Sequence, residues 1–167
     1  MYKDEFKKVA TLCVLKYENK FLLLKRFNEP NVGKYVPVGG KLRQNETPKD
    51  GVIRETFEET GIRVYDPKFF GILTETSPTK YNWISYIFSS EIKLIDPPIS
   101  DEGKLEWIKY DDILNIPTPL TDHHIYKFIL EDKKFIINAQ YDDKLDLIEL
   151  REEISTVSYT HLRAHET

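Results

Sequence analysis

Residues 40–62 read GKLRQNETPKDGVIRETFEETGI, and the second half of this stretch has the features of a helix with defined ends. Thr47 suits the N-cap, because its hydroxyl can accept a hydrogen bond from a free backbone N–H. Pro48 suits the first helical position, where a missing N–H costs nothing. Gly61 suits the position after the last turn, where a left-handed backbone ends many helices. We therefore expect a helix between Thr47 and Gly61.

The expected helix carries three glutamates on one face. Glu55, Glu58 and Glu59 are spaced i, i+3, i+4, so they project together. A solvated acidic face is the ordinary interpretation of such a cluster. The alternative is a site for Mg²⁺ or Mn²⁺, which prefer carboxylate oxygens, water and substrate phosphates. The opposite side of the helix should be buried, and its residues are Ile53, Thr56, Phe57 and Thr60.

Three glycines lie close to this acidic face in the sequence and favour the metal-site interpretation. Gly51 has no side chain, so we expect it to let a substrate approach the helix closely. Gly39 and Gly40 precede the loop before the helix, where they permit an unusual backbone geometry and an exposed carbonyl.

The stretch 40–62 resembles the Nudix box, the signature of the Nudix hydrolases. That signature is Gly, five residues, Glu, seven residues, Arg-Glu, an aliphatic residue, any residue, Glu-Glu, any residue, Gly and an aliphatic residue. Seven fixed residue types in this order would coincide by chance with a probability on the order of 10⁻⁸ per starting position. Thr56 departs from the signature, and many members have an additional Glu near Arg43 and a Gly at the position of Asn45. The matching residues are Gly40, Glu46, Arg54, Glu55, Glu58, Glu59, Gly61 and Ile62.

This resemblance implies an enzyme that cleaves a pyrophosphate bond in a nucleotide, with Mg²⁺ (or Mn²⁺) as its cofactor. It implies that Glu55, Glu58 and Glu59 bind the catalytic metals and that the Gly39 carbonyl is a further ligand. The metal ions would stabilise the developing charge and lower the pKa of the attacking water.

The resemblance also assigns supporting roles around the helix. Arg54 should pair with Glu46 and brace the loop, and Lys41 should reach a substrate phosphate. A carboxylate should accept the proton of the attacking water. Residues 101–107, DEGKLEW, resemble a loop that supplies this group in the MutT-like branch. We favour Glu102 as that base or as an added metal ligand; an ordinary exposed acid is the alternative.

The remainder of the chain predicts short strands around two helices. Because the strands do not alternate regularly with helices, they indicate a mixed sheet, and the resemblance implies the α/β Nudix fold, in which helices sandwich this sheet (α/β/α). A single domain should span residues 1–150. We expect strands at residues 8–17, 21–27, 35–38, 63–76 (interrupted at Asp66-Pro67), 82–95, 104–109, 135–139 and 145–150, a helical turn at 111–115 and a helix at 122–131, the first two strands forming a hairpin.

The end of the chain differs in character from this domain. Residues 151–156 are interpreted as a tail. Residues 157–167 read VSYTHLRAHET and resemble the translation of a sequencing adapter, with an ordinary polar tail as the alternative. We exclude them from fold reasoning as a non-native segment, in which case the natural C-terminus is missing.

Several residues outside the box are candidates for substrate binding. The stretches at residues 33–41 and 101–107 look like those of MutT-type 8-oxo-dGTP diphosphatases, which implies release of a nucleoside monophosphate and pyrophosphate. Arg26 could contact phosphate or be a surface cation. Tyr35 could stack on a base or lie in the core. Asp122 and His123 could hydrogen-bond a purine edge or simply begin a surface helix.

Three functions stay open from the residues alone. The first is hydrolysis of a nucleoside triphosphate such as 8-oxo-dGTP. The second is hydrolysis of another nucleoside diphosphate derivative, such as a dinucleoside polyphosphate, ADP-ribose or an RNA cap. The third is a Nudix-fold binding module without catalysis. The intact Arg54-Glu55 and Glu58-Glu59 pairs disfavour the third, since binding alone does not need all four side chains.

Composition narrows the partners and the location. The net charge is −4, so a nucleic-acid partner, which normally requires a strongly basic surface, is not expected. Cys13 is the only cysteine, so an intramolecular disulfide is impossible. No apolar run approaches the ~20 residues that span a membrane. We expect a cytoplasmic protein with a small nucleotide as its partner, as a monomer or a homodimer.

Overall fold

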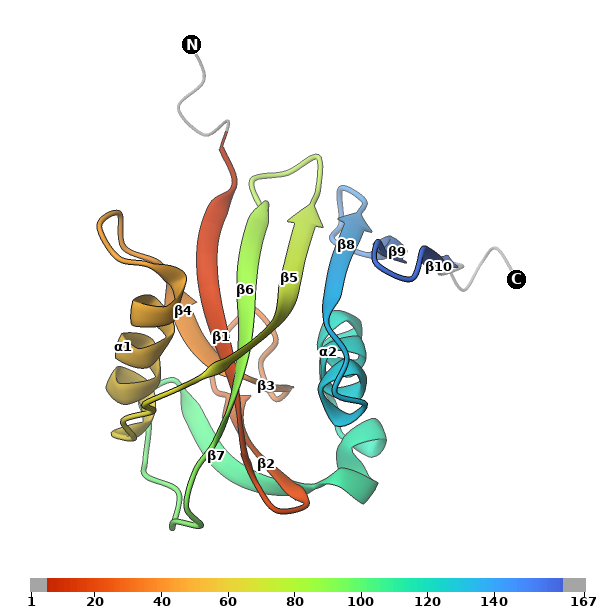
Figure 1. The fold of residues 1–167 in the computed structure, drawn as a ribbon. Helices are drawn as coiled ribbons and strands as arrows, with labels where there is room; N and C mark the ends of the chain where they lie inside the picture. Colours follow the sequence, from red (N-terminus) through yellow and green to blue (C-terminus); the bar gives the residue numbers. More distant parts are fainter. Residues whose placement is uncertain (1–5, 161–167) are drawn as a thin grey trace.

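A computed structural model describes residues 6–160, and its central feature is a large mixed sheet (Figure 1). Within the described part of the chain, ten strands, two α-helices and a short 3₁₀ helix are present. In chain order the elements are β1 (Lys8–Tyr17), β2 (Lys20–Arg26), β3 (Tyr35–Val36), β4 (Val38–Lys41), α1 (Pro48–Thr60), β5 (Lys68–Thr76), β6 (Trp83–Glu91), β7 (Gly103–Lys109), η1 (Tyr110–Asn115), α2 (Leu120–Leu130), β8 (Phe135–Tyr141), β9 (Leu147–Glu152) and β10 (Val157–Thr160).

The strand order of the sheet is β10-β9-β8-β5-β6-β1-β2-β3, with β4 paired to β1 and β7 paired to β2. Strand β1 runs parallel to β6, and β5 runs parallel to β8. The remaining pairs are antiparallel, including the expected β1–β2 hairpin. The prediction of a mixed sheet is therefore confirmed, and its centre joins strands that lie far apart in the sequence.

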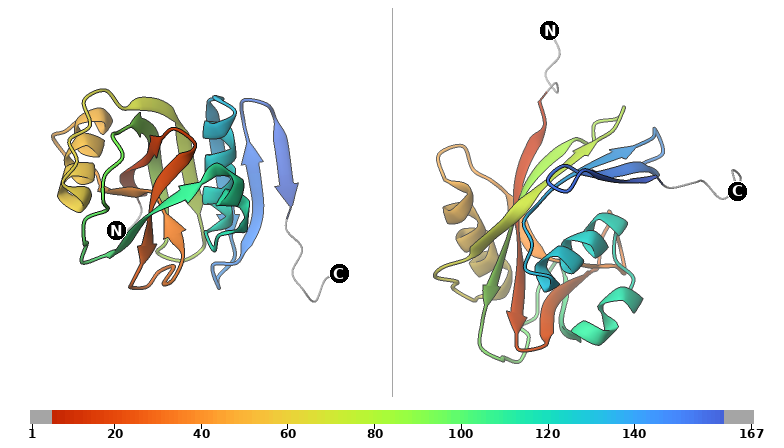
Figure 2. Two further views of the ribbon diagram at one scale, coloured as in Figure 1. Left: turned by 90° about the horizontal axis from the view of Figure 1, so that it is seen from below. Right: turned by 45° about the vertical axis from the view of Figure 1, so that its right-hand side comes forward.

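Two hydrophobic cores lie on the two faces of this sheet because side chains alternate along each strand. On β1, Val14 faces a core shared with Ile125 of α2. The neighbouring Cys13 faces a second core shared with Val52 of α1. Helices α1 and α2 consequently cover opposite faces, as Figures 1 and 2 show. The expected α/β/α layering is present.

Helix α1 begins and ends where its capping residues predict. The Thr47 hydroxyl accepts a hydrogen bond from the Asp50 N–H at 3.2 Å. Gly61 adopts a left-handed backbone with φ 73°, and its N–H donates to the Phe57 carbonyl. Both ends of the acidic helix are therefore fixed by local interactions.

Two expectations about the faces of α1 were wrong. Phe57 is 45% exposed, because the buried ridge of the helix runs through Val52 rather than through Phe57. The Arg63 guanidinium lies over the exposed ring, 5.0 Å from its centroid. Gly51 does not open the helix to a substrate: Leu42 and Glu46 of the preceding loop cover it, and a Cβ there would collide with Leu42.

The sheet continues past residue 150, where we expected the domain to end. Strand β9 extends to Glu152, and β10 pairs with it antiparallel, with Val157 opposite Glu152. The Tyr159 ring packs near His124 of α2, with their centroids 4.8 Å apart. The first four residues of the tail excluded from fold reasoning are thus part of the sheet. Its origin stays a prediction, and residues 161–167 lie outside the described chain.

Other element boundaries differ from expectation in ways that prolines explain. Of the strand expected at 63–76 with an interruption at Asp66-Pro67, only the part after the interruption is formed, from Lys68 to Thr76; Pro67 cannot donate to a strand ladder. Helix α2 begins two residues before Asp122 because Pro119 occupies its N-cap position.

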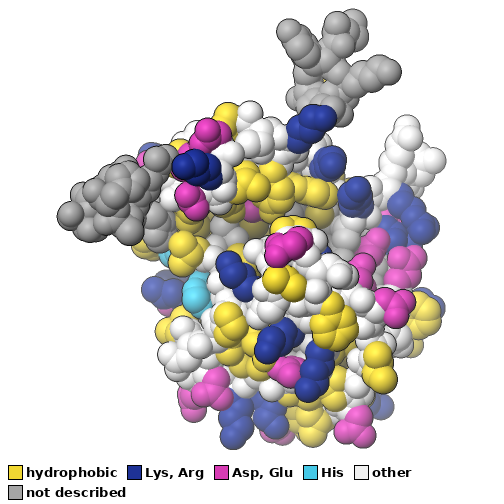
Figure 3. Space-filling model, turned by 180° about the vertical axis from the view of Figure 1, so that it is seen from behind, with side chains coloured by type: hydrophobic (Ala, Val, Ile, Leu, Met, Phe, Trp, Pro, Cys, Tyr) yellow, Lys and Arg dark blue, Asp and Glu magenta, His cyan; other side chains and the backbone are white. Residues whose placement is uncertain are grey.

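Among the described residues, no helix is long and apolar enough to cross a membrane. One face of the molecule carries basic and acidic side chains in mixture rather than a basic patch (Figure 3).

Candidate active site

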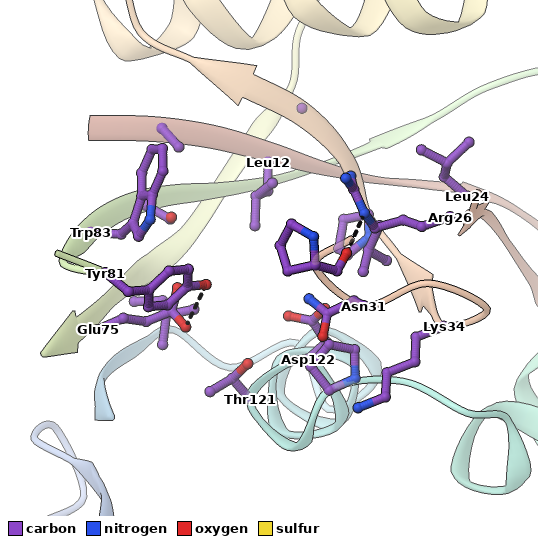
Figure 4. A pocket seen from close by; sticks show the side chains of 18 of the residues that line it. Leu12, Leu24, Arg26, Asn31, Lys34, Glu75, Tyr81, Trp83, Thr121 and Asp122 are labelled. Carbon is purple, nitrogen blue, oxygen red and sulfur yellow. Dashed lines mark hydrogen bonds between the residues drawn. The ribbon is translucent and has the colours of Figure 1, made fainter. Parts of the chain in front are cut away.

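A cleft of about 890 Å³ reaches from α1 to the start of α2. Glu55 and Glu59 of α1 line one part of it, together with Glu102. Glu75 of β5 and Asp122 of α2 line another part (Figure 4). The cleft therefore joins the acidic helix to a second acidic region. The helices that contribute to the two regions, α1 and α2, cover opposite faces of the sheet.

Arg54 organises the loop beside the acidic helix. Its Nε and Nη2 donate to the two oxygens of Glu46, at 3.0 and 2.6 Å, in a bidentate ion pair. Nη2 also donates to the Lys41 carbonyl at 3.0 Å. These hydrogen bonds hold the pKa of Glu46 near 2 and raise that of Arg54. The pair that the resemblance implied is thus formed, and it ties the loop to α1.

Glu55 approaches the backbone of β4 very closely. Its Oε1 accepts a hydrogen bond from Nη1 of Arg54 at 2.7 Å. A Cβ atom on Gly40 would overlap the Glu55 carboxylate, so any other residue at that position would displace the carboxylate. Gly40 is therefore needed for the position of the carboxylate in the cleft.

Glu59 and Glu102 meet across the cleft although 43 positions separate them in the sequence. Glu59 accepts a hydrogen bond from the Gly39 N–H at 3.4 Å. Burial, and after it the neighbouring Glu102 carboxyl, raise the pKa of Glu59. Two carboxyls this close favour a shared proton or a bound cation between them. The loop acid suspected from the DEGKLEW stretch therefore does reach the helix.

Glu58 is oriented differently from its two neighbours on the helix. It does not line the cleft, its side chain is 49% exposed, and Nη1 of Arg54 donates to it at 3.2 Å. Nη2 of Arg43 lies 3.6 Å from its other oxygen. Within residues 6–160, no three histidine, cysteine or acidic side chains converge closely enough to form a ready metal site. The three helix glutamates are therefore not assembled around one point in this geometry.

The remaining donors still fit a hard divalent cation. Glu55, Glu59 and Glu102 supply only carboxylate oxygens, which Mg²⁺ and Mn²⁺ prefer. The contact between Glu59 and Glu102 is unfavourable when both are ionised, and a cation would relieve it. Glu58 could join this set only by leaving the two arginines that now hold it.

Cationic side chains line the same cleft and could bind phosphate groups. Arg26 lies there, with its Nε donating to the Pro30 carbonyl at 2.7 Å. Lys41 lies close to the acidic helix, and Lys34 lies on the side of α2 (Figure 4). Two of these three, Arg26 and Lys41, were expected from the sequence, whereas Lys34 was not.

Two of the expected substrate-binding residues do not line the cleft. Tyr35 is buried in the core on the α2 side, and its hydroxyl donates to Glu106. The Lys25 amine lies over the Tyr35 ring, 5.6 Å from its centroid. In this position the buried ring cannot stack on a base. His123 also lies outside the cleft, and its Nε2 is buried without a hydrogen-bond partner among the described residues. Of Tyr35, His123 and Asp122, only Asp122 lines the cleft.

Sequence reasoning missed the polar cluster at the β5 end of the cleft. Glu75 is buried, and the hydroxyls of Tyr141 and Tyr81 donate to its Oε2 at 2.6 and 3.3 Å. The one usable signal was strand phase, because Glu75 lies two positions after the buried Leu73 and therefore points inward with it. Nothing in the sequence near Tyr81 marked it for this cluster.

An acidic helix that lines a cleft, with cationic side chains beside it, suits the binding of phosphate groups together with a divalent metal. A model of the NUDIX domain family matches residues 6–130. The chain belongs to the Nudix hydrolase family, whose members act on nucleoside diphosphate derivatives and generally use a divalent metal.

Known relatives agree with this assignment. The uncharacterized Nudix hydrolase YvcI of Bacillus subtilis is 32% identical over 148 residues, covering 85% of this chain and 92% of its own. Phosphatase NudJ of Escherichia coli K12 is 28% identical over 130 residues, covering 70% and 80%. The crystal structure of a MutT protein from Bacillus halodurans has a TM-score of 0.78 at 29% identity, covering 88% and 98%.

Proposed function

We propose that this protein is a Mg²⁺-dependent pyrophosphohydrolase of a purine nucleoside triphosphate, with 8-oxo-dGTP as the candidate substrate. One observation carries the proposal: a single cleft joins the carboxylates Glu55, Glu59 and Glu102 to an enclosed polar region at Glu75 and Asp122. The first region suits a metal–phosphate group and the second suits a base. The likeness to a MutT protein supports the same class of substrate.

In this proposal the residues of the chain divide the work along the cleft. Lys41 and Arg26 bind the phosphate groups and hold them against the acidic helix. A bound Mg²⁺ neutralises phosphate charge and activates water. Glu102 accepts a proton from the attacking water, because its carboxyl lines the cleft together with Glu55 and Glu59. Arg54 contacts no substrate and positions Glu55.

A second candidate function is release of a single phosphate from a nucleotide or another diphosphate. It is favoured by the similarity to a protein named as a phosphatase, NudJ. The two candidates differ in their products, pyrophosphate in one case and orthophosphate in the other.

The decisive experiment is a substrate panel with Mg²⁺ in which pyrophosphate and orthophosphate are measured separately. The panel contains 8-oxo-dGTP, dGTP, ADP-ribose, a dinucleoside polyphosphate and a capped RNA. We expect the highest kcat/KM for 8-oxo-dGTP, with pyrophosphate released. Orthophosphate as the first product would establish the second candidate, and absence of hydrolysis across the panel would overturn the proposal.

The Glu58→Gln variant tests whether Glu58 leaves Arg43 and Arg54 and joins the metal ligands when Mg²⁺ binds. We expect turnover to fall by orders of magnitude, because an amide cannot replace an anionic metal ligand. The matched control is Glu91→Gln, since the Glu91 side chain is 82% exposed and far from the cleft in the sheet. Near-normal turnover in a folded Glu58→Gln protein would contradict the assignment.

A further inference from the structure

Glu75 is an acidic group enclosed by protein on a strand that otherwise buries apolar residues. Its side chain is only 9% exposed, yet it lines the cleft. Among the described residues its carboxyl forms no direct ion pair, although the Lys7 amine, which donates to the Glu75 backbone carbonyl at 2.7 Å, interacts with it electrostatically. Burial is the largest influence on this carboxyl and raises the pKa of Glu75. Enclosing a carboxyl without a direct ion pair is costly unless hydrogen bonds or a ligand compensate.

The hydrogen bonds to Glu75 are concentrated on one of its two oxygens. The hydroxyls of Tyr141 and Tyr81 both donate to Oε2, at 2.6 and 3.3 Å. Among the described residues, none donates to Oε1. Because a carboxylate oxygen can accept two hydrogen bonds, Oε1 is an unused acceptor in a side chain that faces the cleft.

The surroundings of Glu75 suit a flat ring. Figure 4 shows Tyr81 and Trp83 beside Glu75, and Asp122 facing the same space from α2. Tyr81 and Trp83 pack edge to face, with centroids 6.4 Å apart. Aromatic surfaces beside a hydrogen-bonding carboxyl are typical of sites that hold a heterocycle by its face and its polar edge.

Asp122 gives this region a second acidic group. It is buried like Glu75, and burial followed by the charge of Glu75 raises its pKa to about 8. Burial thus favours the protonated form of Asp122, which can donate a hydrogen bond as well as accept one. A ring that presents a donor to Glu75 can thus present either kind of group to Asp122.

We propose that Oε1 of Glu75 accepts a hydrogen bond from an exocyclic amino group of the substrate ring, which makes Glu75 a specificity-determining residue for amino-substituted bases. This inference rests on the proposed nucleotide hydrolysis and specifies the ring end of that substrate. A carbonyl in place of the amino group would set two acceptors against each other. A hydrogen in its place would leave Oε1 desolvated and unpaired, which is also unfavourable.

Pairs of nucleotides that differ in one amino group test this directly. The pairs are dGTP with dITP, which lacks the 2-amino group, and dCTP with dUTP, which has a carbonyl at that position. In at least one pair we expect the wild-type kcat/KM to be at least about tenfold higher for the amino-bearing nucleotide. In Glu75→Gln, whose amide can present either a donor or an acceptor, the preference should fall to within about threefold. Glu91→Gln, an exposed carboxyl outside the cleft, is the control and should keep the wild-type ratio.

A binding measurement keeps the inference separate from catalysis. Calorimetric titration with dGMP and dIMP needs no hydrolysis, and we expect the dGMP preference to be lost in Glu75→Gln.

If the wild type hydrolyses nucleotides but treats both members of every pair alike, the inference is overturned and the proposed function stands. Retention of the wild-type preference by a folded Glu75→Gln protein overturns it as well. If no nucleotide is hydrolysed but the Glu75-dependent binding preference is present, the proposed function fails and the inference stands. If Glu75→Gln does not fold, Tyr141→Phe replaces it, because loss of the hydroxyl that orients Oε2 should weaken the same preference.

Discussion

Nη2 of Arg43 lies 3.6 Å from Oε1 of Glu58, so a basic residue of the loop holds an acidic residue of the catalytic helix away from the cleft. A metal that uses Glu58 as a ligand would therefore have to compete with Arg43, and with Arg54, for its carboxylate.

We predict that Arg43→Gln lowers the Mg²⁺ concentration needed for half-maximal activity. The ion pair is exposed, and such pairs are worth about 0.2–1 kcal/mol, so the change should be at most about fivefold. The measurement is a Mg²⁺ titration of the initial rate. Lys49→Gln is the control, because Lys49 of α1 forms a similarly exposed ion pair with Asp66, which lies after the helix. An unchanged or higher Mg²⁺ requirement in Arg43→Gln would count against the competition.

The Glu46–Arg54 pair should make stability depend on pH at the acid end. The folded-state pKa of Glu46 is about 2, below its ordinary value of 4.5, so its contribution is present above pH 4.5 and is lost as the pH falls towards 2. We predict that Glu46→Gln lowers the free energy of unfolding at pH 7 by about 1–3 kcal/mol. The difference from wild type should shrink by pH 2.5. Denaturant unfolding at both pH values measures it, and a constant difference would exclude this explanation.

Gly40→Ala should impair catalysis more than folding. The added methyl would overlap the Glu55 carboxylate and displace it, and displacement of a catalytic group by 1 Å can cost about 100-fold in rate. Gly61→Ala is the opposite control. Its φ of 73° makes a side chain unfavourable, but the space around it is free and it lies outside the cleft. We expect lower stability with normal kcat in Gly61→Ala and the reverse in Gly40→Ala, as measured by thermal unfolding and steady-state kinetics.

Removal of residues 157–167 should leave hydrolysis unchanged. None of the described residues of this segment lines the cleft. The deletion removes the pairing of β10 with β9 and the contact of Tyr159 with His124, so a small decrease in Tm is expected. Activity assays and thermal unfolding of the shortened chain measure the two effects. A clear loss of activity in the folded protein would contradict the interpretation of this segment as a foreign addition.

The predictable parts of the fold were those determined by local sequence. Helix α1 ends at Gly61 because of the backbone freedom of one residue, and β1 and β2 pair through a short turn. The strand order was not predictable in this way. The parallel pairing that places Lys8 opposite Trp83 joins segments 75 positions apart, and no local pattern in either segment names its partner.

The same distinction between local and long-range contacts applies to the candidate site. Glu46 and Arg54 lie within one motif, and their pairing could be expected from it. Tyr35 was named as a substrate-binding candidate with the core as the alternative, and it lies in the core, where its hydroxyl donates to Glu106, a residue 71 positions away that no local pattern indicates. Glu75 was overlooked because its neighbours in the cleft come from other strands and loops.

The two cores on opposite faces of the sheet have a consequence for how such a protein can diversify. Val52 anchors α1, the helix proposed to bind the metal, in one core, and Ile125 anchors α2, which borders the proposed ring end of the cleft, in the other. Substitutions that remodel the second core reach α1 only through the backbone of the shared strands. An ancestral enzyme could therefore acquire a new substrate preference while its hydrolytic machinery was inherited intact, and protein engineers can use the same separation.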